Sequence, residues 1–457
     1  MSRKIYSAFV RIERWLRMRF TPVGRLMLST LIAVGLFALN PRATLAYQLA
    51  LLVFAIVVGA MLWAPAFRPA FSARRRLPKF ATVGVPVEYT LELENLKRRQ
   101  LTDLEAIDEP QRVTSKQTMI QARRERRLDR ARPWASRRVG YMKFVRTLRW
   151  LEGARCLPST IDTLSLGIVT RVPMQFTPTR RGYVRLCALR LTRTDPLGVF
   201  RAAACVQLDD QVLVFPKRYR VSWSGAAQSS RHAQQGAIRT RNSGQGADFA
   251  RLREYRPLDP MRHIHWRAWA RLGEPMVKEF HEESPSRNAL LLDVCVRADV
   301  VDEITFEEAV SVAASFVAET GWCAGQLDLL IAGKHRVQAG GSTQGQGVVR
   351  MLEVLACVQA ARDEEFAALT RDLFVDLERF SACVLVLLDL DPQRVEFVRA
   401  LQQAQVCVLV LLVSVRTRHE LADALGSLPS PHQVHVVNPQ QAERALAALS
   451  SHGAVDG

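Results

Sequence analysis

The stretch SACVLVLLDLDPQRVEFVRALQQAQVCVLVLLVS, residues 381–414, decides the fold of the C-terminal half. Two continuous apolar runs rich in valine and leucine flank an amphipathic segment that begins at Pro392. Continuous apolar runs are typical of strands covered on both faces, and an amphipathic segment between them indicates a connecting helix. Because the same alternation continues over residues 288–457, the sequence predicts a doubly wound α/β domain there.

Carboxylates follow two of these apolar runs. In open α/β sheets, ligands bind outside the carboxyl ends of the strands, so Asp293 and the pair Asp389 and Asp391 are the first candidates for a site. Short polar residues also end strands and cap the next helix, and Pro392 fits helix initiation. We favour this structural role over a functional one.

Residues 80–220 have a different pattern. The segment VEYTLELEN (87–95) alternates strictly between apolar and polar residues, which is typical of a half-buried strand. Further short runs, including VPMQFTP and GYVRLCALRLT, are separated by turn residues. We therefore expect a small antiparallel β domain, interrupted by a basic insertion over 97–155.

The basic insertion has too few large apolar residues to build a core. The whole chain has 457 residues, a formal net charge of +19 and a pI near 10.2, which suits an anionic partner. We expect the insertion to bind an anionic membrane surface rather than nucleic acid, because no motif with stacking aromatics accompanies it. Binding of nucleic acid or anionic lipid through 97–155 remains an alternative function.

Two apolar runs lie near the N-terminus, over residues 26–64, after a basic segment over 1–25. Their length and composition predict two transmembrane helices in a hairpin. Basic residues lie on both flanks, while only Arg42 lies between the runs, so the positive-inside rule predicts cytoplasmic flanks. We therefore expect a multi-pass inner-membrane protein with cytoplasmic domains, rather than a cleaved signal peptide. The eight cysteines occur singly, without a C-x-x-C pair, which indicates thiols in a reducing compartment.

The segment GQGADFARLREYRPLDPMRHIHWRAWARLGEPMVKEF (244–280) is the most distinctive in the chain. It closely resembles the signature of a bacterial family called domain of unknown function fifty-eight. The matching residues are Gly244, Gly246, Asp248, Phe249, Leu252, Arg253, Glu254, Tyr255, Asp259, Arg262, Ile264, Trp266, Ala270 and Arg271. We place this signature segment at residues 221–287.

The resemblance implies an architecture and a partner. Its order is a membrane hairpin, a β domain, the signature and a von Willebrand factor A-like end. Members of the family are typically encoded beside a MoxR-type AAA+ ATPase, so the resemblance implies that partner. We expect a membrane-tethered scaffold or adaptor in a chaperone-like or assembly system, not an enzyme, and we expect no cofactor.

The signature interleaves charges of both signs with aromatic residues. Arg253, Arg262 and Arg271 can fork onto carboxylates such as Asp259, while Trp266 offers a face for stacking. We favour such a structural network over an anionic-ligand site built on the Gly-x-Gly backbone, because that motif alone is weak evidence. A hydrolase that uses Asp259 with neighbouring histidines is a second alternative, but no known catalytic motif supports it.

Cation-binding von Willebrand factor A domains use Asp-x-Ser-x-Ser after the first strand. The corresponding residues here are Asp293, Cys295 and Arg297, with Asp389 after a later strand. Hard cations need oxygen ligands, and a thiol and a guanidinium do not supply them. We therefore expect a degenerate cation site that holds no metal.

Overall fold

The computed structural model describes residues 12–38, 44–67, 69–96, 100–111, 150–221, 223, 249–256, 259, 261–280, 287–295, 303–319, 326–331, 337–339, 344–361, 366, 380, 382–403, 406–426, 428 and 434–452. The chain forms two compact units. The first holds residues 1–217 with 298–302 and 352–359, and the second holds the remainder. Most of the predicted basic insertion, residues 112–149, lies outside the described residues.

Two sheets make up the β part of the first unit. One has the order β1 (Phe71–Arg76), β3 (Val87–Asn95), β7 (Val169–Pro178) and β5 (Ala154–Cys156). The other has the order β2 (Phe80–Thr82), β9 (Arg201–Phe215), β8 (Gly182–Thr194), β4 (Leu101–Pro110) and β6 (Ser159–Leu164). All neighbouring strands are antiparallel except β2 and β9.

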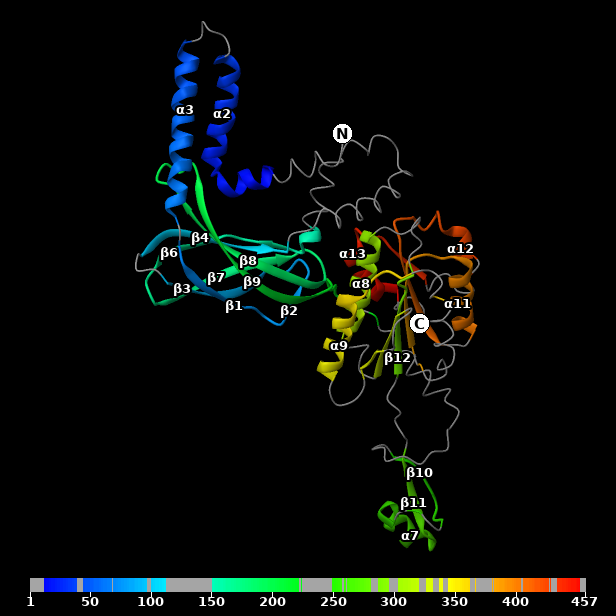
Figure 1. Cartoon of the computed structure of the whole chain (residues 1–457). Helices are drawn as coiled ribbons and strands as arrows, with labels where there is room; N and C mark the ends of the chain where they lie inside the picture. Colours follow the sequence, from blue (N-terminus) through cyan, green and yellow to red (C-terminus); the bar gives the residue numbers. More distant parts are fainter. Residues whose placement is uncertain are drawn as a thin grey trace. The chain divides into compact units, whose positions relative to one another are not determined.

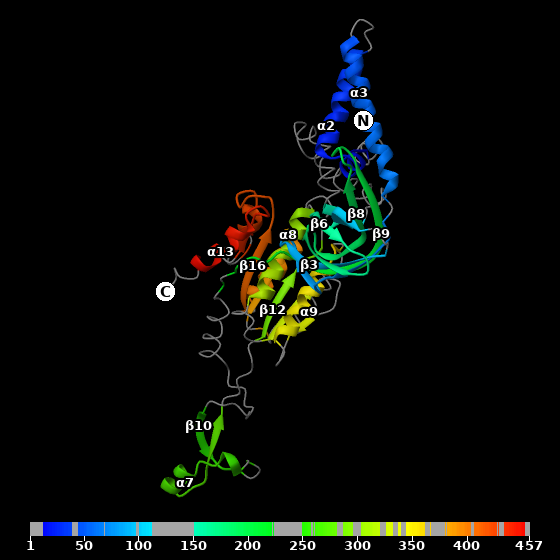
Figure 2. The ribbon, with the colours of Figure 1, turned by 90° about the vertical axis from the view of Figure 1, so that its left-hand side faces the viewer.

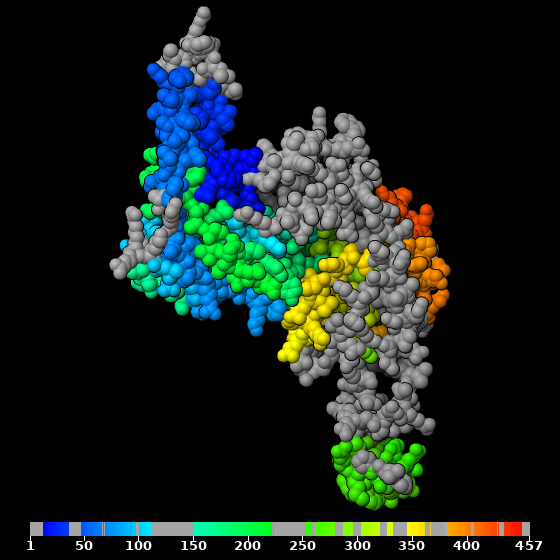
Figure 3. Space-filling view, in the orientation of Figure 1, coloured from blue at the N-terminus to red at the C-terminus, as the bar shows by residue number. Residues whose placement is uncertain are grey.

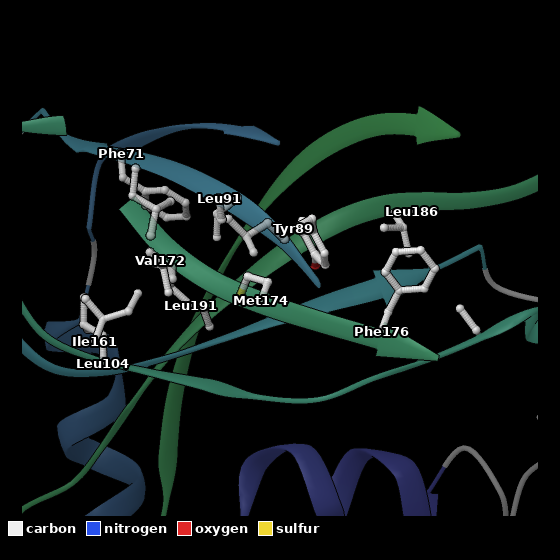
Figure 4. Close-up of a cluster of buried hydrophobic side chains, with 14 of the residues drawn as sticks. Phe71, Tyr89, Leu91, Leu104, Ile161, Val172, Met174, Phe176, Leu186 and Leu191 are labelled. Carbon is white, nitrogen blue, oxygen red and sulfur yellow. The ribbon is translucent and has the colours of Figure 1, made fainter. Parts of the chain in front are cut away.

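The two sheets share one apolar core, because each strand turns alternate side chains inward. In β3, Tyr89, Leu91 and Leu93 are buried, as the alternation of VEYTLELEN predicts. They belong to the same buried cluster as Phe176 on β7 and Leu186 on β8 (Figure 4). The β part is therefore a sandwich held by a single core.

Two helices precede the sandwich and lie side by side (Figure 1). They are α2 (Pro22–Ala38) and α3 (Thr44–Trp63), and a 3-10 turn, η1 (Ala64–Ala66), follows. Among the residues that the structure describes, no helix is both long enough and apolar enough to cross a membrane. At about 1.5 Å per residue, the 17 residues of α2 fall short of the roughly 20 that a hydrocarbon core requires. The predicted transmembrane hairpin over 26–64, and the multi-pass inner-membrane location, are therefore wrong.

Several basic residues that suggested a membrane orientation have partners within the protein. Arg14 forms an ion pair with Glu152 at 2.6 Å, and Arg17 forms one with Glu13 at 2.5 Å. Arg75 is buried inside the sandwich. The charges of these residues therefore stabilise contacts within the chain. The positive-inside rule counts basic residues beside an apolar run and does not consider whether they have such partners.

The base of α2 is attached to the turn between β8 and β9. The Thr21 amide donates to the carbonyl of Val199 at 3.1 Å, and the Thr21 hydroxyl donates to the carbonyl of Gly198. The rings of Phe20 and Phe200 pack edge to face with centroids 5.1 Å apart. Hydrogen bonds and apolar contacts together fix where α2 begins.

The α/β part of the second unit contains a six-stranded sheet. Its order is β14 (Val337–Ala339), β13 (Gln326–Ile331), β12 (Arg287–Leu292), β15 (Ala382–Leu387), β16 (Cys407–Val413) and β17 (Val434–Val437). All pairs are parallel except β13 with β14. The chain enters at β12, moves outward to β13 and then returns to the other side at β15. The strand order therefore reverses between β12 and β15, which is the position where open α/β sheets bind ligands.

Helices cover both faces of this sheet. Helix α8 (Glu303–Ala318) contacts β12, β15 and β16 and lies over the sheet in Figure 2, and α11 (Pro392–Gln403) lies on the opposite face (Figure 1). The remaining helices are α9 (Gln344–Cys357), α12 (Ala422–Gly426) and α13 (Ala442–His452). Because both faces are covered, β15 and β16 are apolar throughout, and all six residues of β15 are buried.

Candidate functional site

Asp293 lies where the strand order reverses. It follows β12, it has no exposed surface, and its amide donates to the carbonyl of Val386 on β15 at 2.9 Å. Asp391 follows β15 and is largely buried. The expectation that carboxylates gather at the carboxyl ends of these two strands is confirmed for this pair.

A buried arginine lies between the two carboxylates. Nε of Arg394 donates to Oδ2 of Asp293 at 2.7 Å, and its Nη2 approaches Oδ1 of Asp293 at 3.2 Å. Its Nη1 donates to Asp391, and its Nη2 also donates to the carbonyl of Cys295 at 2.9 Å. The guanidinium lies 4.5 Å from the ring centroid of Phe366. Arg394 is thus fully buried, with its charge paired and its face covered by an aromatic ring.

The start of α11 brings Arg394 to this position. Pro392 begins the helix, and Oδ1 of Asp391 accepts a hydrogen bond from the Arg394 amide at 2.8 Å. This is the geometry of a helix cap, so the expected capping role of Asp391 is confirmed. The capped first turn carries the Arg394 side chain back toward the end of β12.

The carboxylate of Asp293 is fully engaged. Besides Arg394, the amide of Cys295 donates to its Oδ1 at 2.9 Å, and the amide of Leu388 donates to its Oδ2 at 3.4 Å. Burial raises the pKa of the Asp293 carboxyl, while the guanidinium and these amides oppose that rise. An ionised carboxylate has about four acceptor positions, and here four N–H groups use them.

The residues predicted for a degenerate cation site are only partly brought together. Cys295 contributes its backbone N–H and carbonyl to the cluster. Asp389 accepts from the amide of Leu390 at 2.9 Å and lies 3.9 Å from Arg416. Arg297 lies outside the described residues. In the described part of the chain, no group of three or more His, Cys, Asp or Glu side chains is arranged to hold a metal ion.

The signature segment folds into a small module of its own, green in Figure 3. It consists of β10 (Phe249–Glu254), η3 (Met261–His263), α7 (Trp266–Leu272) and β11 (Met276–Phe280). The two strands are antiparallel, with Arg253 opposite Val277. Gly244, Gly246 and Asp248, which we predicted as part of the signature, lie outside the described residues.

Backbone and side-chain caps define the helix of the module. Nδ1 of His265 accepts a hydrogen bond from the Ala268 amide at 3.0 Å and so caps the start of α7. Gly273 ends the helix with a φ of 76°, a left-handed conformation that glycine adopts without steric cost. His265, one of the histidines near Asp259 in the hydrolase alternative, therefore has a structural role in this helix.

Arg253 and Asp259 form a bidentate ion pair. The two guanidinium nitrogens of Arg253 approach the two oxygens of Asp259 at 2.7 and 2.6 Å. The amide of Arg256 also donates to Asp259 at 2.8 Å. These hydrogen bonds, first of all the one from Arg253, lower the pKa of Asp259. The pairing of Arg253 with Asp259, which was considered from the sequence, is thus present in the structure.

The helical side of the module presents apolar and basic side chains to solvent. Met261 is 75% exposed, and Trp266 and Leu272 are each 64% exposed. Trp266 stacks on Trp269 with ring centroids 5.3 Å apart and an interplanar angle of 21°. Arg262, Arg267 and Arg271 are also exposed. We call the set Met261, Arg262, Trp266, Arg267, Arg271 and Leu272 the Trp–Arg surface.

The remaining predicted signature residues have modest roles. Glu254 is exposed, and its carbonyl accepts from Arg253 at 3.0 Å. The amide of Tyr255 donates to the carbonyl of Pro275 at 2.9 Å, which continues the pairing of the two strands. Phe249 pairs with Phe280 at the other end of the strands.

Sequence reasoning missed a buried polar cluster in the sandwich. Nε of Arg75 lies 3.1 Å from both oxygens of Asp108, and Nη2 of Arg75 lies 2.8 Å from one of them. The hydroxyl of Tyr89 donates to Asp108, and Asp210 lies 2.9 Å from Nη1 of Arg75. The inward position of Arg75 in the alternation of β1 was the available signal.

Residues 251–451 match the family model described as "Protein of unknown function DUF58". The uncharacterized protein YeaD of Bacillus subtilis (strain 168) is 32% identical over 139 residues, which are 30% of this chain and 33% of that protein. The chain thus matches about a third of that relative's length. One solved structure that matches is the CARDB domain of the PF1109 protein from Pyrococcus furiosus, in complex with di-metal ions. The matched region covers 32% of this chain and 88% of the CARDB chain, at 12% identity. The TM-score is 0.16, so no conclusion is drawn from this likeness. The match over 251–451 includes most of the module and the whole α/β sheet, and this region of the chain is similar to the DUF58 family.

Proposed function

We propose that this protein is a non-catalytic adaptor that docks a MoxR-type AAA+ ATPase through its DUF58 region. In this proposal the α/β part is von Willebrand factor A-like, and the partner follows from the family resemblance. The observation that carries the proposal is the Trp–Arg surface, which gathers exposed aromatic, aliphatic and guanidinium groups on one short helix and the turn before it.

The composition of this surface suits a protein interface. Tryptophan and arginine are the residue types most enriched among interface positions that dominate binding energy. Trp266 is held flat against Trp269, so that little side-chain entropy is lost when a partner covers it. The Arg253–Asp259 pair joins β10 to Asp259, which precedes η3 in the chain. A surface that is already ordered binds at a lower cost.

The charge of the module indicates the chemistry of the partner. Among its described residues, Arg256, Arg262, Arg267 and Arg271 are exposed, against exposed Glu254 and Glu274. The partner surface that complements it is acidic, with an apolar pocket for Trp266. We therefore assign the docking surface of the ATPase to an acidic patch.

The carboxylates considered for catalysis are occupied by structural partners. Asp259 accepts from Arg253 and from the Arg256 amide, which lowers its pKa and weakens it as a base. Asp293 is buried and bound by Arg394. These contacts favour the adaptor over the hydrolase alternative. Binding of nucleic acid or anionic lipid through 97–155 stays a prediction, since 112–149 lie outside the described residues.

A retention assay tests the proposal. The full chain is immobilised and incubated with a MoxR-type ATPase from the same genome, in ATP and in ADP. We expect retention by the wild-type chain, and a loss of retention in Trp266→Ser that Tyr183→Ser does not show. Tyr183 is a matched control because it is an aromatic residue 55% exposed on the sandwich. Equal retention of the ATPase by both variants contradicts the assignment of the surface.

A further inference from the structure

At the position where the strand order reverses, the negative charges of the cluster are balanced by positive groups of the chain itself. Two carboxylates, Asp293 and Asp391, face one guanidinium, Arg394. The N-terminus of the 12-residue helix α11 adds about half a positive charge beside Asp391. The negative charge is therefore largely compensated by groups that belong to the chain.

The donor geometry also leaves no acceptor position of Asp293 open. Both oxygens of Asp293 bind the guanidinium, at 2.7 and 3.2 Å, and both accept a backbone N–H. The carbonyl of Cys295 is directed at the same guanidinium, at 2.9 Å. A divalent cation would need these oxygens as ligands. It could bind only if Arg394 left a position in which it is fully buried.

We propose that Arg394 is the resident cation of this protein, which holds the ends of β12 and β15 together and keeps divalent metal out. The chain lacks the Asp-x-Ser-x-Ser pattern of cation-binding domains, and a guanidinium supplies the positive charge in place of a metal ion. The contact links residues 101 positions apart in the chain. The carboxyl ends of β12 and β15 are then always occupied by the Arg394 guanidinium, which compensates the negative charge there.

Hydrogen exchange of the full chain, followed by mass spectrometry over residues 287–295 and 382–390, tests this proposal. It is measured in EDTA and in excess Mn²⁺. For the wild-type chain, we expect the same protection of both segments in the two conditions. Slower exchange in Mn²⁺ that Asp293→Asn abolishes overturns the proposal, because it shows a metal site that uses this carboxylate.

Removal of the guanidinium gives the complementary result. In Arg394→Ala, Asp293 and Asp391 lose their compensating charge, so we expect both segments to exchange at least tenfold faster in EDTA. We expect Mn²⁺ to restore protection in this variant, and not in the double variant that adds Asp293→Asn. If Arg394→Ala exchanges at the wild-type rate in EDTA, or if Mn²⁺ does not restore protection in this variant, the guanidinium does not take the place of a metal ion and the proposal is overturned.

A third variant covers the case in which Arg394→Ala does not fold. Arg394→Met keeps most of the side-chain volume and removes the charge, and the same two expectations apply to it. If neither variant folds, the comparison of wild type with Asp293→Asn still decides whether metal enters the site.

Discussion

The carbonyl oxygen of Val199 lies where a side chain on Gly24 would begin. A Cβ atom at residue 24 would come within 2.0 Å of this oxygen, which belongs to the backbone of the turn between β8 and β9. The same turn accepts the Thr21 amide, so helix α2 starts in direct contact with the sandwich. Only a residue without a side chain permits this approach.

We expect Gly24→Ala to destabilise the first unit by about 1–3 kcal/mol, because either the helix or the turn must shift. The control is Gly35→Ala in the same helix, where a Cβ meets nothing within 4 Å. Better helix propensity there predicts a gain of about 0.5–1 kcal/mol. Urea unfolding measures both variants, and equal behaviour would show that the contact with Val199 is unimportant.

Arg75 and Arg76 are adjacent in sequence and differ in environment. Arg75 is buried and forks onto Asp108, while the side chain of Arg76 is 63% exposed and pairs with Glu92. Arg75→Met leaves a buried carboxylate without its cation, so we expect a loss of about 3–5 kcal/mol. Arg76→Met should change the free energy of unfolding by no more than about 1 kcal/mol. Chemical denaturation that gives similar values for both would contradict the buried cluster.

The Arg253–Asp259 pair makes the module sensitive to acid. The pKa of Asp259 is lowered in the folded state by its hydrogen bonds from Arg253 and Arg256. A carboxyl with a depressed folded pKa stabilises the fold above its unfolded pKa, and this contribution is lost as the pH falls through the folded pKa. We therefore expect wild type to be more stable than Asp259→Asn at pH 7, and the difference to begin to shrink as the pH falls below about 4, the unfolded pKa, and to be lost below the folded pKa. A difference in melting temperature that does not decrease at all between about pH 5 and about pH 2 would show that the ion pair is not its source.

Thiol reactivity distinguishes the interior of the parallel sheet from the sandwich surface. Burial raises the pKa of the Cys383 thiol on β15 to about 12, whereas Cys205 on β9 is exposed. The thiolate is the reactive form, so iodoacetamide at pH 8 should label Cys205 in the native protein and Cys383 only after unfolding. Peptide mass spectrometry measures both rates. Comparable native labelling of the two cysteines would place Cys383 outside the core.

Local patterns predicted a large part of the fold. The apolar runs before Asp293 and Asp389 are strands of a parallel sheet, and the alternation over 87–95 is a strand with one buried face. Both patterns depend on which faces of a strand are covered, and this information is local. The placement of Asp293 and Asp391 at neighbouring strand ends follows from the same patterns.

Pairings between distant residues were not predictable. Arg394 meets Asp293 across 101 residues, and Arg75 meets Asp108 across 33. A sequence shows which residues carry charge but not which charges share a buried position. The membrane prediction failed for a different reason: among the described residues no helix is both long enough and apolar enough to cross a membrane, and a count of apolar and basic residues does not show where a helix ends.

The affinity of the full chain for a MoxR-type ATPase, measured by titration for wild type and for Arg267→Glu, tests the adaptor account most directly. Arg444→Glu is the control, because Arg444 is an exposed helical arginine of α13, outside the Trp–Arg surface. A surface position that dominates binding is worth about 2 kcal/mol, so we expect roughly 30-fold weaker binding for Arg267→Glu and wild-type binding for Arg444→Glu. Wild-type affinity in both variants, or no binding by the wild-type chain in ATP or ADP, would contradict docking through this surface.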